Sequence, residues 1–503
     1  MHATVPPPAP PAPPAPKKRG PSTPEGKARS ALNGTRHGLC SIEFFLLPDE
    51  DPQAYALFVV DLLHLLQPRS PAEHQAAERV AQARWRERPA PERAAVLRRT
   101  ADLYEERSDE LARTIASEMG KPLEQASQEV ELAASIYRWY ADNGPDLLRE
   151  EELDAQGALR SVVRKEPVGV LLGVMPWNYP YYQVARFVAP NLMLGNTILL
   201  KHAGICAASN ELMEQILLEA GLPEGGFINL LAPTQIIPDV IADPRVQGVS
   251  LTGSEAAGAS VAEAAGKSLT KSVLELGGSD AMLVLDAGDV DAMARTAAKA
   301  RLSNSGQACN SPKRMFVADA IHDEFVEKVT QHVAATVVGD PLDEATQMGP
   351  MSSAQARDDV HEQVQDAVSK GAVVHTGGEP LPGDGAFYAP TVLTGITPEM
   401  RAWDEELFGP IVMIYRMTDV DAALDQANAS SFGLSGSVWS DDPEKAADVA
   451  DRLDVGMAYV NEHGTTKPGL PFGGVKRSGY GRELAADGMN EFVNRKLVRV
   501  AAR

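Results

Sequence analysis

The 503-residue chain has few cysteines and no long apolar run. Its three cysteines, Cys40, Cys206 and Cys309, are too few for a disulfide framework, and they fit a reducing compartment. No apolar run reaches the roughly 18–20 residues needed to span a bilayer, and the N-terminus has no apolar signal-peptide core. We therefore expect a cytoplasmic protein that does not cross a membrane.

Metal ligands and an excess of positive charge are also missing. No group of cysteines and histidines has the spacing of metal ligands, so no metal site is predicted. The formal net charge of -22 disfavours nucleic acid as the main partner and favours solubility. A hydrophobic fraction of 44% and a charged fraction of 23% are typical of a globular enzyme, and the length allows two or three domains.

The first 77 residues differ in composition from the rest. Residues 1–16 contain eight prolines, which cannot build a core, and residues 17–36 are rich in lysine and arginine. We interpret residues 1–77 as a Pro-rich, basic and partly disordered N-terminal extension. Apolar residues have helical spacing in segments 52–66, 73–84, 90–117 and about 123–143.

From residue 168 onward, short β-rich runs alternate with helical stretches. The predicted strands are 168–175, 197–200, 227–231, 246–251 and 281–285, and the predicted helices lie near 207–220, 235–242 and 254–265. This alternation predicts βαβ units and a parallel sheet covered on both faces. A second α/β stretch is expected after Glu275.

Two features after predicted strands suit a nucleotide. Gly253, Ser254 and Gly258 lie where a strand gives way to a helix, whose free N–H groups and dipole favour a phosphate. Lys201 ends another strand, at the edge where parallel sheets bind ligands. Small residues at such a junction also serve for capping or packing, and a strand-end lysine can simply face solvent. The residues alone leave both interpretations open.

Seven motifs follow one another along the chain. They are MPWNYP (175–180), LLKHA (199–203), TGSEAAG (252–258), LELGGSD (274–280), GQAC (306–309), EELFGP (405–410) and PFGGVKRSGYGRE (471–483). In this order they resemble the aldehyde dehydrogenase superfamily, from about Glu78 to the C-terminus. Within it, the bacterial succinate-semialdehyde dehydrogenases are the group that they resemble most. The resemblance implies an α/β fold with a Rossmann-like cofactor domain, an α/β catalytic domain and a small β-element for oligomerisation.

The resemblance also assigns roles to residues of this chain. Cys309 resembles the family's nucleophile, Glu275 its general base and Asn178 its oxyanion donor. A thiolate, a separate base and a hydrogen-bond donor are what the oxidation of an aldehyde through a cysteine thioester requires. We expect Cys309 to ionise near neutral pH beside the bound cofactor. Contacts with that cofactor are implied for Trp177, Lys201, Gly253, Ser254, Gly258, Leu276, Glu406 and Phe408.

Three further positions bear on the choice of substrate and cofactor. In succinate-semialdehyde dehydrogenases, an arginine at the spacing of Arg186 grips the remote carboxylate of the substrate, and an internal salt bridge is the alternative role for it here. Some of those enzymes have a second arginine at the position of Ser303. NAD-specific relatives often have a glutamate at the position of Gly204, so the predicted cofactor is NAD or NADP.

The resemblance finally predicts how the chain is organised. Residues 78–274 are expected to form the cofactor-binding domain, 275–477 the catalytic domain and 478–503 a C-terminal return. Segments near 149–165 and 492–503 match the family's oligomerisation strands, so a homodimer or homotetramer is expected.

The predicted function is the NAD(P)-dependent oxidation of an aldehyde to a carboxylic acid, with succinate semialdehyde as the leading substrate. The alternatives are a dehydrogenase for another aliphatic or aromatic aldehyde, and a non-catalytic binding protein on the same fold.

Overall fold

The computed structural model of this protein describes residues 85–502. The N-terminal extension, the predicted helices 52–66 and 73–84 and Cys40 lie outside the described residues. Within the described part of the chain, no helix is both long and apolar enough to cross a bilayer.

In the described part of the chain, a group of helices precedes the first sheet. They are α4 (Ala90–Glu106), α5 (Ser108–Met119) and α6 (Leu123–Leu147). The prediction of one continuous helix over 90–117 is wrong, because the chain breaks at Arg107, whose φ and ψ are -107° and 21°. Residues 108–110 are Ser-Asp-Glu, which favour a new helix start because acidic side chains suit the first turn. The helix predicted over 123–143 is confirmed and extends to Leu147.

A six-stranded sheet follows, in the strand order β17-β7-β6-β3-β4-β5. Its members are β3 (Val170–Met175), β4 (Thr197–His202), β5 (Phe227–Asn229), β6 (Val246–Thr252), β7 (Lys271–Glu275) and β17 (Gly479–Tyr480). The strands from β7 to β5 pair in parallel, as predicted, whereas β17 pairs with β7 in antiparallel fashion. Strand β7, which ends at Glu275, is not among the predicted strands.

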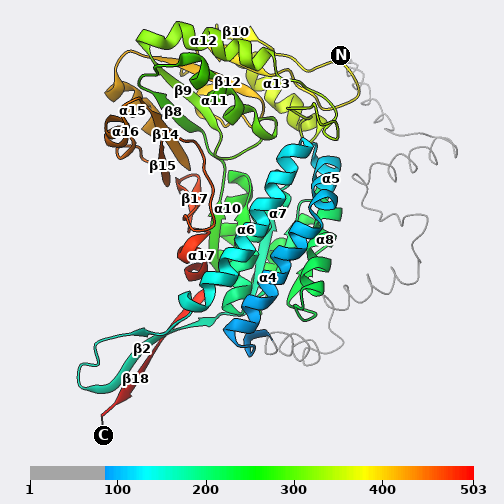
Figure 1. The fold of residues 1–503 in the computed structure, drawn as a ribbon, viewed down its shortest axis with the longest axis vertical. Helices are drawn as coiled ribbons and strands as arrows, with labels where there is room; N and C mark the ends of the chain where they lie inside the picture. Colours follow the sequence, from blue (N-terminus) through cyan, green and yellow to red (C-terminus); the bar gives the residue numbers. More distant parts are fainter. Residues whose placement is uncertain (1–84, 503) are drawn as a thin grey trace, which may run out of the picture. The chain divides into compact units, whose positions relative to one another are not determined.

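Different helices cover the two faces of this sheet (Figure 1). The helices are α7 (Pro180–Leu194), α8 (Ala207–Glu219), α9 (Ile237–Ala242) and α10 (Glu255–Ser268). Leu171 and Leu172 are neighbours on β3, yet Leu171 packs in the core that includes α7 and α8, and Leu172 packs with α9 and α10. This alternation buries both faces of the strand and explains its unbroken apolar sequence.

Helix α7 was absent from the prediction for a physical reason. All of its residues are buried, from Pro180 to Leu194. A helix that is buried on every side lacks the polar face that reveals helical spacing in a sequence.

A seven-stranded sheet forms the second half of the fold, in the order β10-β11-β12-β9-β8-β14-β15. The strands are β8 (Asp280–Val284), β9 (Pro312–Ala318), β10 (Val373–Thr376), β11 (Thr391–Thr394), β12 (Ile411–Met417), β14 (Ser435–Trp439) and β15 (Met457–Val460). The helices are α11 (Val290–Leu302), α12 (Asp319–Ala334), α13 (Ala354–Ser369), α14 (Arg401–Asp404), α15 (Val420–Asn428) and α16 (Pro443–Ala450). Met282 and Leu283 of β8 again belong to different cores, so this sheet too is covered on both faces.

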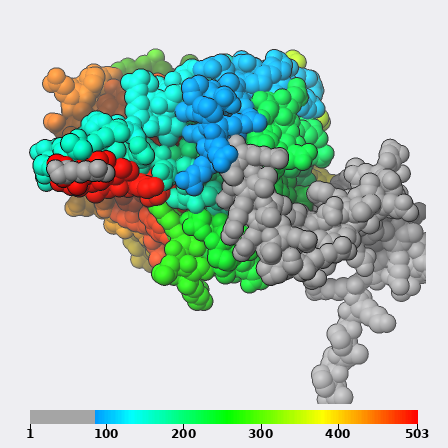
Figure 2. All heavy atoms as spheres, turned by 90° about the horizontal axis from the view of Figure 1, so that it is seen from below, coloured from blue at the N-terminus to red at the C-terminus, as the bar shows by residue number. Residues whose placement is uncertain are grey.

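A third, antiparallel sheet joins distant parts of the sequence. Its strands are β1 (Glu151–Glu152), β2 (Ala158–Pro167) and β18 (Val493–Ala501). β2 and β18 run side by side away from the helices in Figure 1, and Figure 2 shows them from below as adjoining cyan and red segments. The remaining elements are η1 (Gly204–Cys206), η2 (Thr234–Ile236), η3 (Ser303–Gly306), β13 (Phe432–Gly433), β16 (Val475–Lys476) and α17 (Ala485–Glu491).

Candidate active site

Cys309 lies in a tight loop between α11 and β9. Just before it, Asn304, Ser305 and Gly306 adopt left-handed φ values of 52°, 56° and 72°. A side chain on Gly306 would meet the carbonyl oxygen of Gly409 at 2.0 Å, so only glycine fits there. Left-handed backbone is costly at Asn304 and Ser305, and such strained residues cluster at functional sites.

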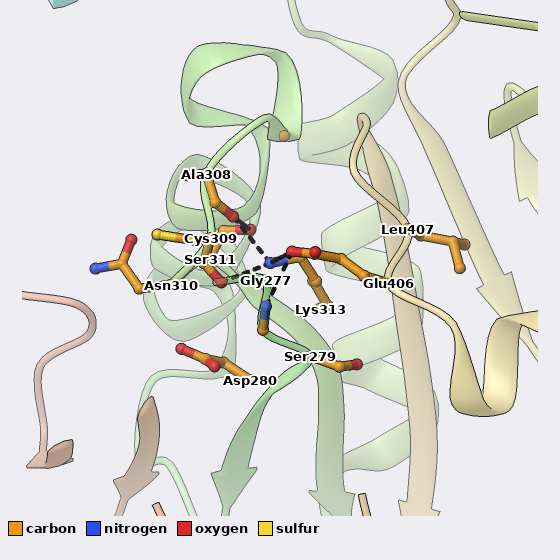
Figure 3. A network of polar contacts seen from close by, with 12 residues as sticks. Gly277, Ser279, Asp280, Ala308, Cys309, Asn310, Ser311, Lys313, Glu406 and Leu407 are labelled. Carbon is orange, nitrogen blue, oxygen red and sulfur yellow. Dashed lines mark hydrogen bonds and ion pairs between the residues drawn. The ribbon is translucent and has the colours of Figure 1, made fainter. Parts of the chain in front are cut away.

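Lys313 fixes the backbone of this loop by hydrogen bonds. Its buried Nζ donates to the carbonyl oxygens of Ala308 at 2.9 Å and Cys309 at 2.8 Å. It also forms an ion pair of 3.0 Å with Glu406 (Figure 3). In Figure 3 the thiol of Cys309 points to the opposite side of the loop from this amino group. Sequence reasoning missed Lys313, although a lysine just before the run Met315-Phe316-Val317-Ala318, near the start of a strand, was a usable signal.

The thiol of Cys309 is protonated in the protein alone. Burial raises its pKa to about 12, and the positive charges of Arg186 and Lys313 oppose this only in part. Ionisation near neutral pH therefore needs a further positive charge beside the sulfur.

Asn178 follows β3 and is held on both sides of its amide. Its Nδ2 donates to the carbonyl oxygen of Gln307 at 3.0 Å, two residues before Cys309. Its Oδ1 accepts from Nε2 of Gln183 at 3.0 Å. A side-chain amide nitrogen carries two hydrogens, so the second can serve a developing oxyanion beside Cys309.

Glu275, at the end of β7, lies in a very different setting. Its side chain is buried, and within residues 85–502 neither carboxylate oxygen has a hydrogen-bond partner. Burial raises its pKa well above the usual range; Arg186 opposes this shift and Glu483 reinforces it. A side chain on Gly473 would lie 2.8 Å from Oε1, so the glycine leaves room for this carboxylate.

The residues predicted for phosphate binding lie at the carboxyl ends of β4 and β6. Ser254 is the N-cap of α10, and its Oγ accepts from the backbone N–H of Ala257 at 3.3 Å. Lys201 donates from Nζ to the carbonyl oxygen of His202 at 2.7 Å, and burial lowers its pKa. Ser254 is exposed, so the N-terminus of α10 is open to a ligand.

Gly253, Gly258 and Leu276 bring α10 close to the strand that carries the base. The N–H of Gly253 donates to the carbonyl oxygen of Glu275 at 3.0 Å. A side chain on Gly258 would meet Leu276 at 2.6 Å. In this structure, the role of Gly253, Gly258 and Leu276 is therefore to pack α10 closely against the end of β7.

The other predicted cofactor residues meet near the loop of Cys309. Trp177 and Phe408 form an edge-to-face pair with ring centroids 5.9 Å apart. Glu406 accepts from the N–H of Gly278 at 3.2 Å, and a side chain on Gly277 would lie 2.1 Å from its Oε2. The glycines after Glu275 thus make room for a second carboxylate.

Arg186 does not have the exposure that a substrate clamp requires. Only 1% of its side chain is exposed, and its guanidinium forms an ion pair with buried Glu483. It also donates to the hydroxyl of Tyr182 at 3.2 Å and to Thr252 at 3.1 Å. The structure thus contains the internal salt bridge, which was the alternative role for Arg186. In this conformation the guanidinium is not available to bind the carboxylate of the substrate.

Both ring nitrogens of His463 already have partners within the protein. Its Nε2 donates to the carbonyl oxygen of Asn310 at 2.6 Å, and its Nδ1 lies 3.1 Å from the hydroxyl of Ser437. Burial lowers its pKa to about 4, so it is neutral near pH 7.

No group of metal-binding side chains was found in the described part of the chain.

Comparisons with known proteins agree with this arrangement. A model of the aldehyde dehydrogenase family matches residues 70–498. The chain is 54% identical over 416 residues to a succinate-semialdehyde dehydrogenase [NADP(+)] of Deinococcus radiodurans, covering 82% of this chain and 87% of that one. It is 44% identical over 405 residues to the enzyme of the same name from Mycobacterium avium, covering 80% and 86%.

A comparison with solved structures shows that the fold is shared as well. Succinic semialdehyde dehydrogenase from Streptococcus pyogenes, in complex with NADP+, superposes with a TM-score of 0.83 at 37% identity. The alignment covers 93% of this chain and 99% of that one. These matches confirm the predicted fold class and the resemblance read from the motifs, and the chain belongs to the aldehyde dehydrogenase family.

Proposed function

We propose that this chain oxidises succinate semialdehyde to succinate, preferring NADP and also accepting NAD, through a thioester on Cys309. The observation that carries the proposal is the grouping of three residues: the Cys309 loop accepts a hydrogen bond from the Asn178 amide, and the charge of buried Glu275 helps to raise the pKa of the Cys309 thiol. The names of the relatives from Deinococcus and Mycobacterium support the substrate and the cofactor.

The residues fit a dinucleotide. An exposed helix N-terminus at Ser254 suits a pyrophosphate, and Lys201 at the end of β4 suits a ribose or its phosphate. Gly204 is exposed with open space around it, so no carboxylate at this position repels a 2′-phosphate. Glu406 and Phe408 would hold the end that reacts. When bound, the dinucleotide supplies the acceptor for the hydride that the substrate loses.

In the first half of the reaction, Cys309 is the nucleophile. Its Sγ, as thiolate, forms a bond to the aldehyde carbon, and the carbonyl oxygen becomes negatively charged. Asn178 donates its free amide hydrogen to that oxygen. One such donor is worth about 3–4 kcal/mol of barrier. Loss of hydride from the same carbon leaves an acyl thioester on Cys309.

In the second half, Glu275 is the general base. It takes a proton from a water molecule, whose oxygen attacks the thioester carbon. The carbon–sulfur bond then breaks, the carboxylic acid leaves and Cys309 is regenerated. A buried carboxylate without hydrogen bonds suits this role, because a raised pKa makes it a stronger base near neutral pH.

The organisation of the protein is part of the proposal. We place the cofactor domain at 78–274, the catalytic domain at 275–477 and the C-terminal return at 478–503, since the chain passes from one sheet to the other between Glu275 and Asp280. A homodimer or homotetramer would form through β18. Exposed apolar side chains on this arm support it: Leu159, Leu497 and Val500. Free thiols at Cys206 and Cys309 are consistent with the cytoplasm.

A second candidate function is the oxidation of an aldehyde without a carboxylate. Two observations favour it: Arg186 is already paired with Glu483, and the position of the family's second arginine is Ser303. The two functions differ only in what recognises the far end of the substrate.

The decisive experiment follows reduced cofactor by its absorbance. Succinate semialdehyde and butanal, which share a four-carbon chain, are compared with NADP and with NAD. We expect a higher kcat/KM for succinate semialdehyde with NADP and no turnover by Cys309→Ala. A higher kcat/KM for butanal would favour the second function, and unchanged turnover by Cys309→Ala would contradict the thioester mechanism.

A further inference from the structure

A buried ion pair lies directly beneath the oxyanion donor. Lys121 and Glu129 pair with side chains that are 1% and 0% exposed. Lys121 comes from the loop between α5 and α6, and Glu129 from the buried side of α6. A charged pair in such a place is costly to desolvate, and replacing it with apolar residues is often neutral or stabilising. Stability alone therefore does not account for it.

Lys121 reaches the backbone of the catalytic residue itself. Its Nζ donates to the carbonyl oxygen of Asn178 at 2.8 Å. It also lies 3.6 Å from the ring centroid of Tyr179. An ammonium group has three N–H bonds, and the carboxylate of Glu129, this carbonyl and this ring face account for all three. Burial lowers the pKa of Lys121, and Glu129 opposes the shift.

Glu129 holds the other end of the same segment. Its Oε1 accepts from the backbone N–H of Tyr181 at 2.9 Å and of Tyr182 at 3.2 Å. These are free first-turn donors of α7, whose N-cap residue, Tyr179, makes no side-chain capping bond. Glu129 thus caps α7 from a neighbouring helix. Lys121 binds the carbonyl of Asn178, two residues before that helix begins.

The segment is also tied to the nucleophile loop. Nδ2 of Asn304 donates to the carbonyl oxygen of Asn178 at 2.8 Å and to that of Gln307 at 3.2 Å. The carbonyl of Asn178 is therefore shared by Lys121 and the loop that ends at Cys309. A shift of this carbonyl would move the amide away from the oxyanion.

We propose that Lys121 and Glu129 act as positioning residues for the reaction, holding residues 178–182 so that the Asn178 amide meets the developing oxyanion. This inference rests on the proposed function, because it needs Asn178 to be the oxyanion donor. A misplacement of about 1 Å can lower a rate by about 100-fold, so the pair has a large effect available to it.

Two reactions of Cys309 separate positioning from general stability. Alkylation by iodoacetamide needs the thiolate but creates no oxyanion. Acylation by p-nitrophenyl acetate needs the same thiolate and does create one. The ratio of the acylation rate to the alkylation rate therefore cancels the fraction of thiolate and reports the oxyanion donor. Both reactions are run without the cofactor at alkaline pH, where part of the Cys309 thiol is ionised, and peptide mapping confirms that Cys309 is the residue modified.

The variants are Lys121→Met, Glu129→Gln and the double substitution, with Asn178→Ala as the reference. We expect each to lower the ratio by about 10-fold or more, and Asn178→Ala by about 100-fold or more. Adding Lys121→Met to Asn178→Ala should lower the ratio no further, because the donor is already absent. Where Lys121→Met alone fails to fold, the double substitution, which removes both charges, carries the test.

Glu118 offers a matched control. It caps α8 from α5 in the same manner, accepting from the N–H of Ala208 at 2.6 Å and from Ser209. Glu118→Gln should leave the ratio unchanged. A wild-type ratio in the Lys121 and Glu129 variants, beside a lowered one in Asn178→Ala, would overturn the inference while the proposed function stands. An unchanged ratio in Asn178→Ala would overturn the inference together with the role of Asn178 as oxyanion donor.

Discussion

Asn178 and Glu275 belong to the same site but differ in their hydrogen bonding. The amide of Asn178 is bonded to Gln183 and Gln307, and its backbone carbonyl to Lys121 and Asn304. The carboxylate of Glu275 has no hydrogen-bond partner in residues 85–502. A donor that must stabilise charge works best when fixed in advance, whereas a base must gain and lose a proton and gains strength from an unsolvated setting. The difference predicts that the two residues serve different halves of the reaction.

The largest expected effect comes from removing the base. Glu275→Gln keeps the size of the side chain but cannot accept the proton of water. We expect steady-state kcat to fall by about 10²–10⁴-fold, because hydrolysis of the thioester then limits turnover. The measurement is steady-state kcat with NADP, and a loss below tenfold would mean that another group acts as the base.

Removing the donor should cost somewhat less and act earlier. Asn178→Ala is expected to lower kcat/KM by about 10²–10³-fold, because the oxyanion forms in the first half of the reaction. Stopped-flow absorbance of the reduced cofactor should show a slow first turnover. A normal first turnover with slow later ones would place Asn178 in hydrolysis instead.

The pH profile should reveal the raised pKa of Glu275. The base must be ionised, so kcat should rise by about tenfold per pH unit until the pH passes that pKa, which burial places above the range of an ordinary glutamate. Measuring kcat from pH 5 to pH 9 tests this, and the same limb should vanish in Glu275→Gln. An identical limb in that variant would assign the titration to another group.

The smallest effect is expected at Gln183, which only orients the Asn178 amide. Gln183→Met removes this single hydrogen bond at similar volume. One neutral hydrogen bond is worth about 0.5–1.5 kcal/mol, so kcat/KM should fall roughly two- to tenfold. Glu118→Gln, at a half-buried carboxylate on another helix, is a suitable control. A loss as large as that of Asn178→Ala would mean that Gln183 does more than orient the amide.

The motifs predicted the fold class, and the β-rich runs predicted β3, β4, β5 and β6 and their parallel pairing, but strand β7 was missed. These patterns were not sufficient for α7, whose fully buried surface leaves no polar face, or for the break at Arg107. Lys121 lies in a short loop and Glu129 in helical sequence, where charged residues are usually exposed, although Glu129 falls beside the buried residues Ala126 and Val130 of α6. A charged residue on an apolar helix face is the signal that could have revealed the pair.

Arg186 shows the limit of spacing as an argument. Its distance from Asn178 in the sequence matches a substrate clamp, but its partner Glu483 comes from the C-terminal part of the chain. Only the folded structure brings the two together, and a buried partner decides what a guanidinium is free to bind.

The most direct test of the division between Asn178 and Glu275 is the mass of Cys309 during turnover. Glu275→Gln is mixed with succinate semialdehyde and NADP, quenched with acid after one turnover and digested for mass spectrometry. The account predicts one equivalent of reduced cofactor per site and a succinyl thioester on the Cys309 peptide. Neither should accumulate in Asn178→Ala on the same timescale. An unmodified Cys309 in Glu275→Gln, with no burst of reduced cofactor, would contradict the assignment of Glu275 to the second half of the reaction.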